Sequence, residues 1–156
     1  MLTTKNGMCT NYSASLISIQ GRNAGGVIGI TLGGGDEVIS MEKLETGKEV
    51  IVITEAGYAK RTTCSSFRTA KARGSKGVRC IPEAKFSETG KVVNVLLISD
   101  DKDDILVVSD DGQTIRFPIS SIPVYSRMAK GLRTIRLQNE DARITGIILT
   151  DGALSQ

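Results

Sequence analysis

Apolar residues along the chain form short β-branched runs and not a helical stripe. The runs EVIVIT (49–54) and KVVNVLLI (91–98) are bounded by polar or glycine-containing turns, a pattern typical of strands. An Asp-Asp-Gly turn within DILVVSDDGQTIRFPI (104–119) predicts a hairpin. No segment of twelve residues places apolar side chains at i, i+3, i+4 and i+7. The pattern predicts an all-β fold.

The sequence contains three similar units. Each begins with a turn that ends in glycine and has a serine eight residues later, the glycines being Gly7, Gly57 and Gly112. A second motif, Arg-x-x-x-Gly-Val/Leu-x-x-Ile, starts at Arg22, Arg73 and Arg127. Its glycine follows the turn glycine by 19, 20 and 19 residues. This regular spacing predicts a repeat architecture.

Each unit has the length and strand pattern of a four-stranded propeller blade. The expected repeats span approximately residues 1–47, 48–102 and 103–149, and 150–156 is a tail or the start of a further blade. Stacked blades should bury residues such as Ile51, Ile53, Val93, Val95, Leu106 and Val108. Three blades make a partial ring with open edges. We therefore expect either a fragment of a longer ring or self-association that completes it.

Charge is segregated along the chain although the net charge is only +3. The windows Tyr58–Pro82 and Gln113–Asn139 contain no acidic residue, whereas Asp100–Asp111 contains six acids. Opposite charges on different segments predict one basic face that attracts nucleic acid. We interpret the acidic stretch as a solvated turn. A propeller-like scaffold that binds protein remains the alternative.

Enzymatic and metal-dependent functions have little support in the sequence. The chain has no histidine, and its three cysteines form no Cys-x-x-Cys pair, so neither a zinc site nor a disulfide framework is indicated. We expect no cofactor, no metal and no catalytic residues. The absence of a signal peptide pattern and of a long apolar run predicts a cytoplasmic protein without membrane contact.

The repeated units resemble a known family. VIVITEAGYAKRT (50–62), ILVVSDDGQTIRFPISSI (105–122), SRMAKGLRTIRL (126–137) and GRNAGGVIGITLGGGDEVISM (21–41) are similar to the C-terminal domain of the A subunit of bacterial type IIA topoisomerases, DNA gyrase and topoisomerase IV. The resemblance implies a propeller-like β-pinwheel, in which neighbouring blades exchange strands. It also implies a non-catalytic module that binds, bends or wraps duplex DNA, and its implied partners are the catalytic core and the B subunit.

A loop in the second unit is similar to the gyrase box, Gln-Arg-Arg-Gly-Gly-Lys-Gly. KARGSKG (71–77) agrees with the box at Arg73, Gly74, Lys76 and Gly77. The box is expected in the first unit, and the family usually has five or six units. A topoisomerase IV domain, which binds without wrapping, would show the same departures and remains the alternative.

Glycines and cations in a loop can bring backbone N–H groups and positive side chains to phosphate oxygens. The expected DNA-binding residues are Lys71, Arg73, Gly74, Lys76, Gly77, Arg79, Arg127, Lys130, Arg133, Arg136, Lys60 and Arg61. For the repeated arginines, an equally supported interpretation is that they bind carbonyls or acids between blades. Lys60 and Arg61 could instead form the polar face of a strand, and Phe67 is expected in the core.

Overall fold

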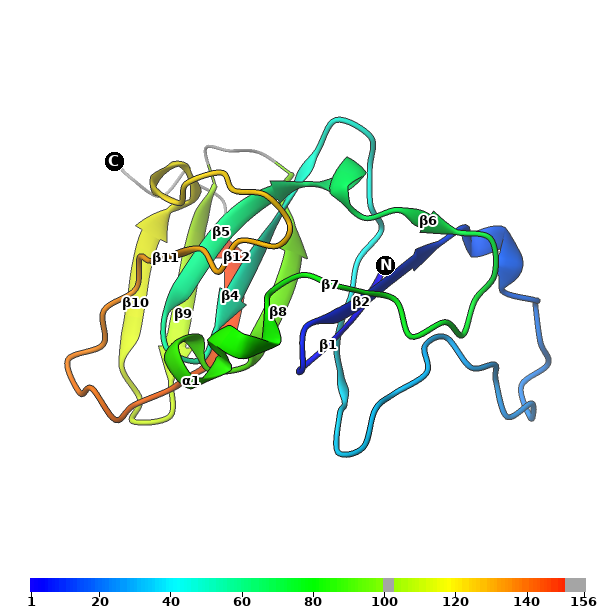
Figure 1. Cartoon of the computed structure of the whole chain (residues 1–156), viewed down its shortest axis with the longest axis horizontal. Helices are drawn as coiled ribbons and strands as arrows, with labels where there is room; N and C mark the ends of the chain where they lie inside the picture. Colours follow the sequence, from blue (N-terminus) through cyan, green and yellow to red (C-terminus); the bar gives the residue numbers. More distant parts are fainter. Residues whose placement is uncertain (100–102, 151–156) are drawn as a thin grey trace.

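The computed structural model, which describes residues 1–99 and 103–150, consists of three small sheets arranged one after another (Figure 1). The first sheet has the strand order β3-β1-β2, and β6 and β7 also pair with β2. The second has the order β11-β5-β4-β8, and the third has the order β10-β9-β12. The strands of the first sheet are β1 (Leu2–Thr4), β2 (Met8–Tyr12), β3 (Val38–Met41), β6 (Thr69–Ala70) and β7 (Val78–Arg79). Those of the second are β4 (Glu49–Thr54), β5 (Tyr58–Thr63), β8 (Val92–Leu97) and β11 (Leu132–Arg133), and those of the third are β9 (Asp104–Ser109), β10 (Thr114–Pro118) and β12 (Ile144–Thr150).

Helical structure in residues 1–99 and 103–150 is confined to short turns. A 3-10 turn follows the second strand of each unit and contains its repeated serine, the three turns being η1 (Ala14–Leu16), η2 (Cys64–Ser66) and η4 (Ile119–Ser121). The second unit adds η3 (Glu83–Lys85) and α1 (Phe86–Thr89). The all-β prediction is confirmed.

Each of the first two sheets is completed by a strand of the next unit. β7 pairs with β2, with Val78 opposite Cys9, and β11 pairs with β5, with Leu132 opposite Ala59. A parallel contact accompanies each exchange, because Asn11 pairs with Thr69 and Arg61 with Val124. These exchanges confirm the pinwheel architecture.

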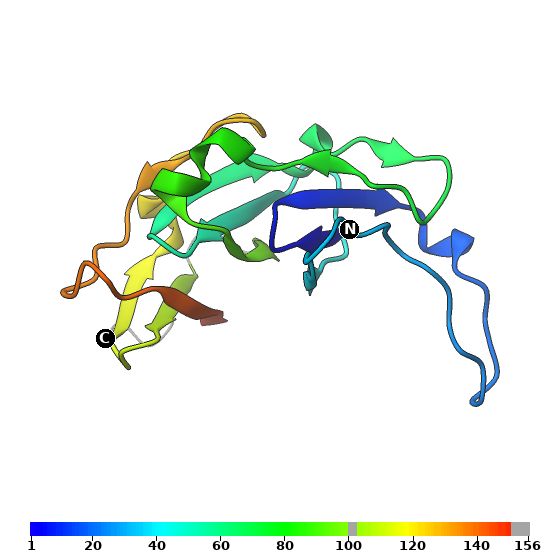
Figure 2. The ribbon, with the colours of Figure 1, turned by 60° about the horizontal axis from the view of Figure 1, so that its bottom comes forward.

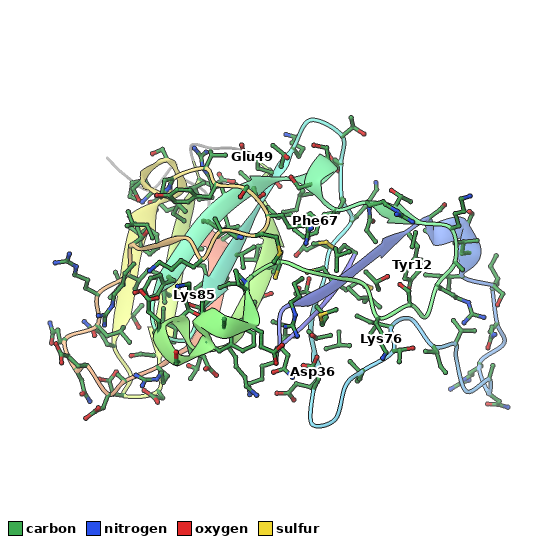
Figure 3. The ribbon with its side chains drawn as sticks, in the orientation of Figure 1. Tyr12, Asp36, Glu49, Phe67, Lys76 and Lys85 are labelled. Carbon is green, nitrogen blue, oxygen red and sulfur yellow. The ribbon has the colours of Figure 1, made fainter. Side chains whose placement is uncertain are left out.

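The strand β4 lies between two hydrophobic cores. Successive side chains of a strand point to opposite faces, and here both faces are covered. Ile51 and Ile53 pack in one core with residues of the third unit, whereas Val50 and Val52 pack in the other with residues of the first. Phe67 is buried in the second of these cores, as expected, and Figure 3 shows it between the first and second sheets.

The predicted core is only partly confirmed, although Val93 does pack against the core of the second and third units. Ile51, Ile53 and Val95 are buried, but Val93, Leu106 and Val108 are only half-buried. In β9 the buried residues are Ile105 and Val107, which have the opposite parity. One face of β9 packs against the second sheet, and the other face is less covered by the described residues.

The segment between η1 and β3 forms an arm that extends away from the sheets (Figure 2). Ile19 in this arm is fully exposed, and Ile28 is 68% exposed. Residues 100–102, within the acidic stretch, and 151–156, the expected start of a further unit, lie outside the described residues. None of the described helices is long and apolar enough to cross a membrane.

Candidate nucleic-acid interface

Three equivalent loops, 22–30, 73–81 and 127–135, lie in a row. Arg73 donates from Nη1 to the carbonyl of Ile28 at 3.1 Å, and Arg127 donates in the same way to the carbonyl of Arg79. Ile28 and Arg79 occupy equivalent positions, two residues after the glycine of the second motif. Arg73 and Arg127 therefore join neighbouring loops, as the alternative interpretation proposed.

The box-like loop 71–77 has a defined conformation on the first sheet. Gly74 and Gly77 have φ of 78° and 79°, and a Cβ at Gly77 would overlap the carbonyl oxygen of Cys9. At position 77 only glycine accommodates both the positive φ and the close approach of the Cys9 carbonyl. The Ser75 hydroxyl lies 2.9 Å from that of Thr10, and the Ser75 carbonyl accepts from the Thr31 N–H at 3.1 Å. The loop is anchored from both sides.

This loop presents cations that no acid among the described residues compensates. Lys71, Arg73 and Lys76 are exposed, and none forms an ion pair with a carboxylate within residues 1–99 and 103–150. Lys76 can be followed in Figure 3 on the loop beside β2. It lines a groove of about 350 Å³ together with Arg68 and Ser75. Two cations and a hydroxyl around one groove suit a phosphate oxygen.

Arg68 was not among the predicted site residues. It is exposed and lines the same groove as Lys76. Its place in the acid-free window Tyr58–Pro82 is the sequence feature that could have identified it as a candidate DNA contact. Its position at the groove depends on the contact between β6 and β2, which the sequence does not reveal.

In and beside the third loop, 127–135, only some of the cations are available to contact DNA. Arg133 and Arg136 are exposed, and neither has a carboxylate partner in the described part of the chain. Lys130, in contrast, pairs with Glu88 and lies over the Tyr58 ring, 5.5 Å from its centroid. Its hydrogen bond to Glu88 raises the pKa of Lys130 and lowers that of Glu88. The charge of Lys130 is already compensated.

Lys60 corrects a prediction, because it lies in the interior and cannot contact DNA there. Its exposed fraction is 1%. Its ammonium donates to the carbonyls of Cys80 (2.7 Å), Ser126 (3.2 Å), Arg127 (2.5 Å) and Ala129 (2.6 Å). Burial lowers the pKa of Lys60 to about 8. Its side chain holds the third loop on the second sheet.

Three other predicted contacts are also engaged within the protein. Arg61 is half-buried, lies 3.6 Å from a Glu49 carboxylate oxygen and donates from Nε to the carbonyl of Ile122. Arg79 is half-buried and pairs with Glu83. Arg127, half-buried, joins two loops as described above. Their structural contacts make them weaker candidates than Lys71 and Lys76.

No group of cysteine and acidic residues within the described ranges has an arrangement that could hold a metal ion. The three cysteines are free and buried. Cys9 and Cys80 interact, and their mutual hydrogen bond lowers the pKa of Cys9 and raises that of Cys80. These thiols belong to the core between the first two units.

Sequence comparisons match most of the chain. A family model described as "DNA gyrase C-terminal domain, beta-propeller" matches residues 1–45, 48–99 and 103–151. The A subunit of DNA gyrase from Fibrobacter succinogenes is 40% identical over 141 residues, which cover 90% of this chain and 15% of that protein. Its counterpart from Thermotoga maritima is 38% identical over 135 residues, 85% of this chain and 16% of that protein. The chain thus spans about a sixth of the length of these curated relatives.

Solved structures share the fold. The C-terminal domain of a DNA topoisomerase IV matches with a TM-score of 0.86 and 23% identity, over 97% of this chain and 46% of that one. A DNA gyrase A C-terminal domain matches with a TM-score of 0.81 and 22% identity, over 94% of this chain and 48% of that one. Both align with less than half of the larger domain.

Proposed function

Because the chain belongs to the family of DNA gyrase C-terminal domains, we propose that it binds duplex DNA along its row of basic loops. It bends or wraps the duplex as a module of a type IIA topoisomerase. The observation that carries this proposal is the anchored loop 71–77, whose cations have no acidic partner among the described residues. The sequence relatives are gyrase proteins, which favours the gyrase assignment over topoisomerase IV.

Backbone contacts explain why such a row suits DNA without reading its sequence. Duplex DNA carries one negative charge per about 1.7 Å of axis, and cations that displace its condensed counterions gain affinity. Lys71, Lys76 and Arg68 form the first contact, and Arg133 and Arg136 the next one along the row. Neighbouring loops are tied by Arg73 and Arg127, so their spacing is fixed. A fixed row of cations favours a bent duplex.

The chemistry of strand passage belongs to other parts of the topoisomerase. We assign no catalytic residue and no cofactor to this chain, and we place its work beside the catalytic core and the B subunit in the cytoplasm. The tyrosines Tyr12, Tyr58 and Tyr125 have no role in cleavage in this proposal.

A charge-matched pair of variants tests the interface. Lys71→Ala with Lys76→Ala should weaken duplex binding and make the negative slope of log K against log salt shallower by about 1.8, because two phosphate contacts are lost. Lys43→Ala with Lys48→Ala removes the same charge from exposed positions between β3 and β4 and should change the slope much less. Fluorescence anisotropy at several salt concentrations measures both. Equal slopes for the two double variants would show that general charge, and not the loop, binds DNA.

A topology assay distinguishes wrapping from binding alone. Nicked circular plasmid is sealed by ligase at increasing protein concentration, and its linking number is read on a gel. A shifted linking number supports chiral wrapping. An unchanged number despite demonstrated binding would limit the module to holding and bending the duplex.

A further inference from the structure

A short helical segment of the second unit brings negative charge to the basic loops. Residues 83–89 form η3 and α1 between β7 and β8, and within the described residues the other two units have no helix at the equivalent place. The acid-free window Tyr58–Pro82 ends at this segment, and Glu83 and Glu88 are the first acids that follow it. A row of cations and two carboxylates therefore lie close together.

Each glutamate pairs with a cation of a different loop. Glu83 pairs with Arg79 of the second of the three equivalent loops, and Glu88 pairs with Lys130 of the third. The Tyr58 hydroxyl donates to the same oxygen of Glu88 at 2.8 Å. One short segment thus compensates a cation in each of two neighbouring loops.

The equivalent cations of the same two loops are free of acids. Lys76 and Lys130 each directly precede the glycine of the second motif, and Arg79 and Arg133 each follow it by two residues. Lys76 and Arg133 are exposed, and neither has a carboxylate partner within residues 1–99 and 103–150. Both positions can therefore present a cation to solvent. At Arg79 and Lys130 the glutamates occupy that cation instead.

Packing holds the segment in place independently of its ion pairs. The Ala56 N–H donates to the Thr89 carbonyl at 3.0 Å, at the end of the second sheet where β4 turns into β5 (Figure 1). Thr89 is fully buried, and Phe86 packs against the core between the first and second units. Removing the charge of Glu83 and Glu88 should therefore leave the segment where it is.

The two ion pairs contribute little to folding, because salt bridges between exposed side chains are weak. The side chains of Lys130 and Glu88 are each 39% exposed, and that of Glu83 is 69% exposed. Their larger effect is on the charge that this surface presents to a ligand.

We propose that the segment 83–89 restrains DNA binding by withholding Arg79 and Lys130 from the duplex. The cations of the row then act as two separate contacts, with Lys76 in one and Arg133 in the other. Fewer phosphate contacts lower both the affinity and its dependence on salt. The inference rests on the proposed function, because it describes the regulation of the same surface.

Glu83→Gln with Glu88→Gln tests the restraint, because glutamine can still accept the Tyr58 hydrogen bond but has no charge. Fluorescence anisotropy with a short duplex should show tighter binding and a negative slope of log K against log salt that is steeper by about 1.8, since two cations become available. Glu45→Gln with Glu140→Gln removes the same charge from exposed acids that have no ion pair in the described part of the chain. This control should change the slope much less. Equal changes in the two double variants would overturn the proposal.

A second comparison tests whether Glu88 acts through Lys130. Glu88→Gln alone, which remains informative if the double variant does not fold, should steepen the slope by about 0.9. In a chain that also carries Lys130→Met the same substitution should leave the slope nearly unchanged, because no cation is released. An equal effect in both backgrounds would contradict the withholding of Lys130.

The restraint and the proposed function fail in different ways. An unmodified chain that binds duplex DNA, together with glutamine variants that bind with the same affinity and slope, would contradict the restraint alone. If neither the unmodified chain nor the variants bind DNA, the proposed function fails and the restraint fails with it.

Discussion

The two junctions between units share a backbone arrangement but differ in the side chains that hold it. At the first, the hydroxyl of Thr10 on β2 meets that of Ser75. At the second, the equivalent residue of β5 is Lys60, whose ammonium donates to four carbonyls. Backbone pairing and glycine conformation define the architecture, and the anchoring side chain is free to vary.

This difference also separates the loops as DNA ligands. The loop 71–77, at the first junction, is held by neutral hydroxyl and backbone contacts, so its cations Lys71 and Lys76 remain exposed. At the second junction Lys60 is buried and Lys130 pairs with Glu88. The charges of Lys60 and Lys130 at the second junction therefore act within the protein, whereas those of Lys71 and Lys76 at the first are available to a ligand.

Removing the glycine of the first junction should have the largest effect. Gly77→Ala adds a Cβ that overlaps the Cys9 carbonyl at positive φ, and we expect a loss of about 4 kcal/mol from strain and overpacking. Gly26→Ala has the same φ and open space, so it should lose only about 1 kcal/mol. Urea denaturation of dilute protein measures both. Similar losses would mean that the contact with β2 is unimportant.

Removing the side chain that anchors each junction should have the next largest effect. Lys60→Ala leaves buried carbonyls without their donor and should cost about 3 kcal/mol. Thr10→Val removes one neutral hydrogen bond and should cost about 1 kcal/mol. Urea denaturation gives the free energies of unfolding of the two variants, and their difference compares the two anchoring side chains. If Thr10→Val costs as much as Lys60→Ala, the two anchors are equivalent and the contrast fails.

The pH dependence of stability provides a further test of the second junction. Burial lowers the pKa of Lys60 from 10.5 to about 8, so between these values the unfolded chain binds more protons than the folded one. Stability therefore rises with pH across this window. Cys80, Cys9 and Arg127 are the charged or titratable groups that act on Lys60.

Comparison with Lys60→Met isolates this contribution, since other groups also titrate above about pH 8. The free energy of unfolding of the unmodified chain, measured from about pH 7.5 to 10, should rise relative to that of the variant. A fall in this difference would show that the four carbonyls hold the ammonium protonated to a higher pH.

The repeat made much of this fold predictable, because turn glycines and β-branched runs act locally. Phe67 was correctly placed in the core, since its equivalents are Ile17 and Ile122. The parity of β9 was not predictable, because Ile105 to Val108 are all apolar, and only the packed neighbour distinguishes their faces. The exchange itself followed from the family resemblance.

The candidate site was predictable only as a region. Acid-free windows located the loops, but Lys60 looks as basic in sequence as Lys71. Its burial depends on a loop that lies a whole unit later in the chain and contributes the carbonyls of Ser126, Arg127 and Ala129. Arg68 was missed for the same reason, because the groove it lines forms only when β6 and the loop 75–78 reach β2.

The exchange of strands has a consequence for synthesis on the ribosome. The sheet that begins with β1 and β2 receives its last strand, β7, only when Val78 and Arg79 have been made. The next sheet likewise requires Leu132 and Arg133. Each blade of the nascent chain must remain incomplete until most of its successor has emerged, so folding follows translation with a delay of one unit.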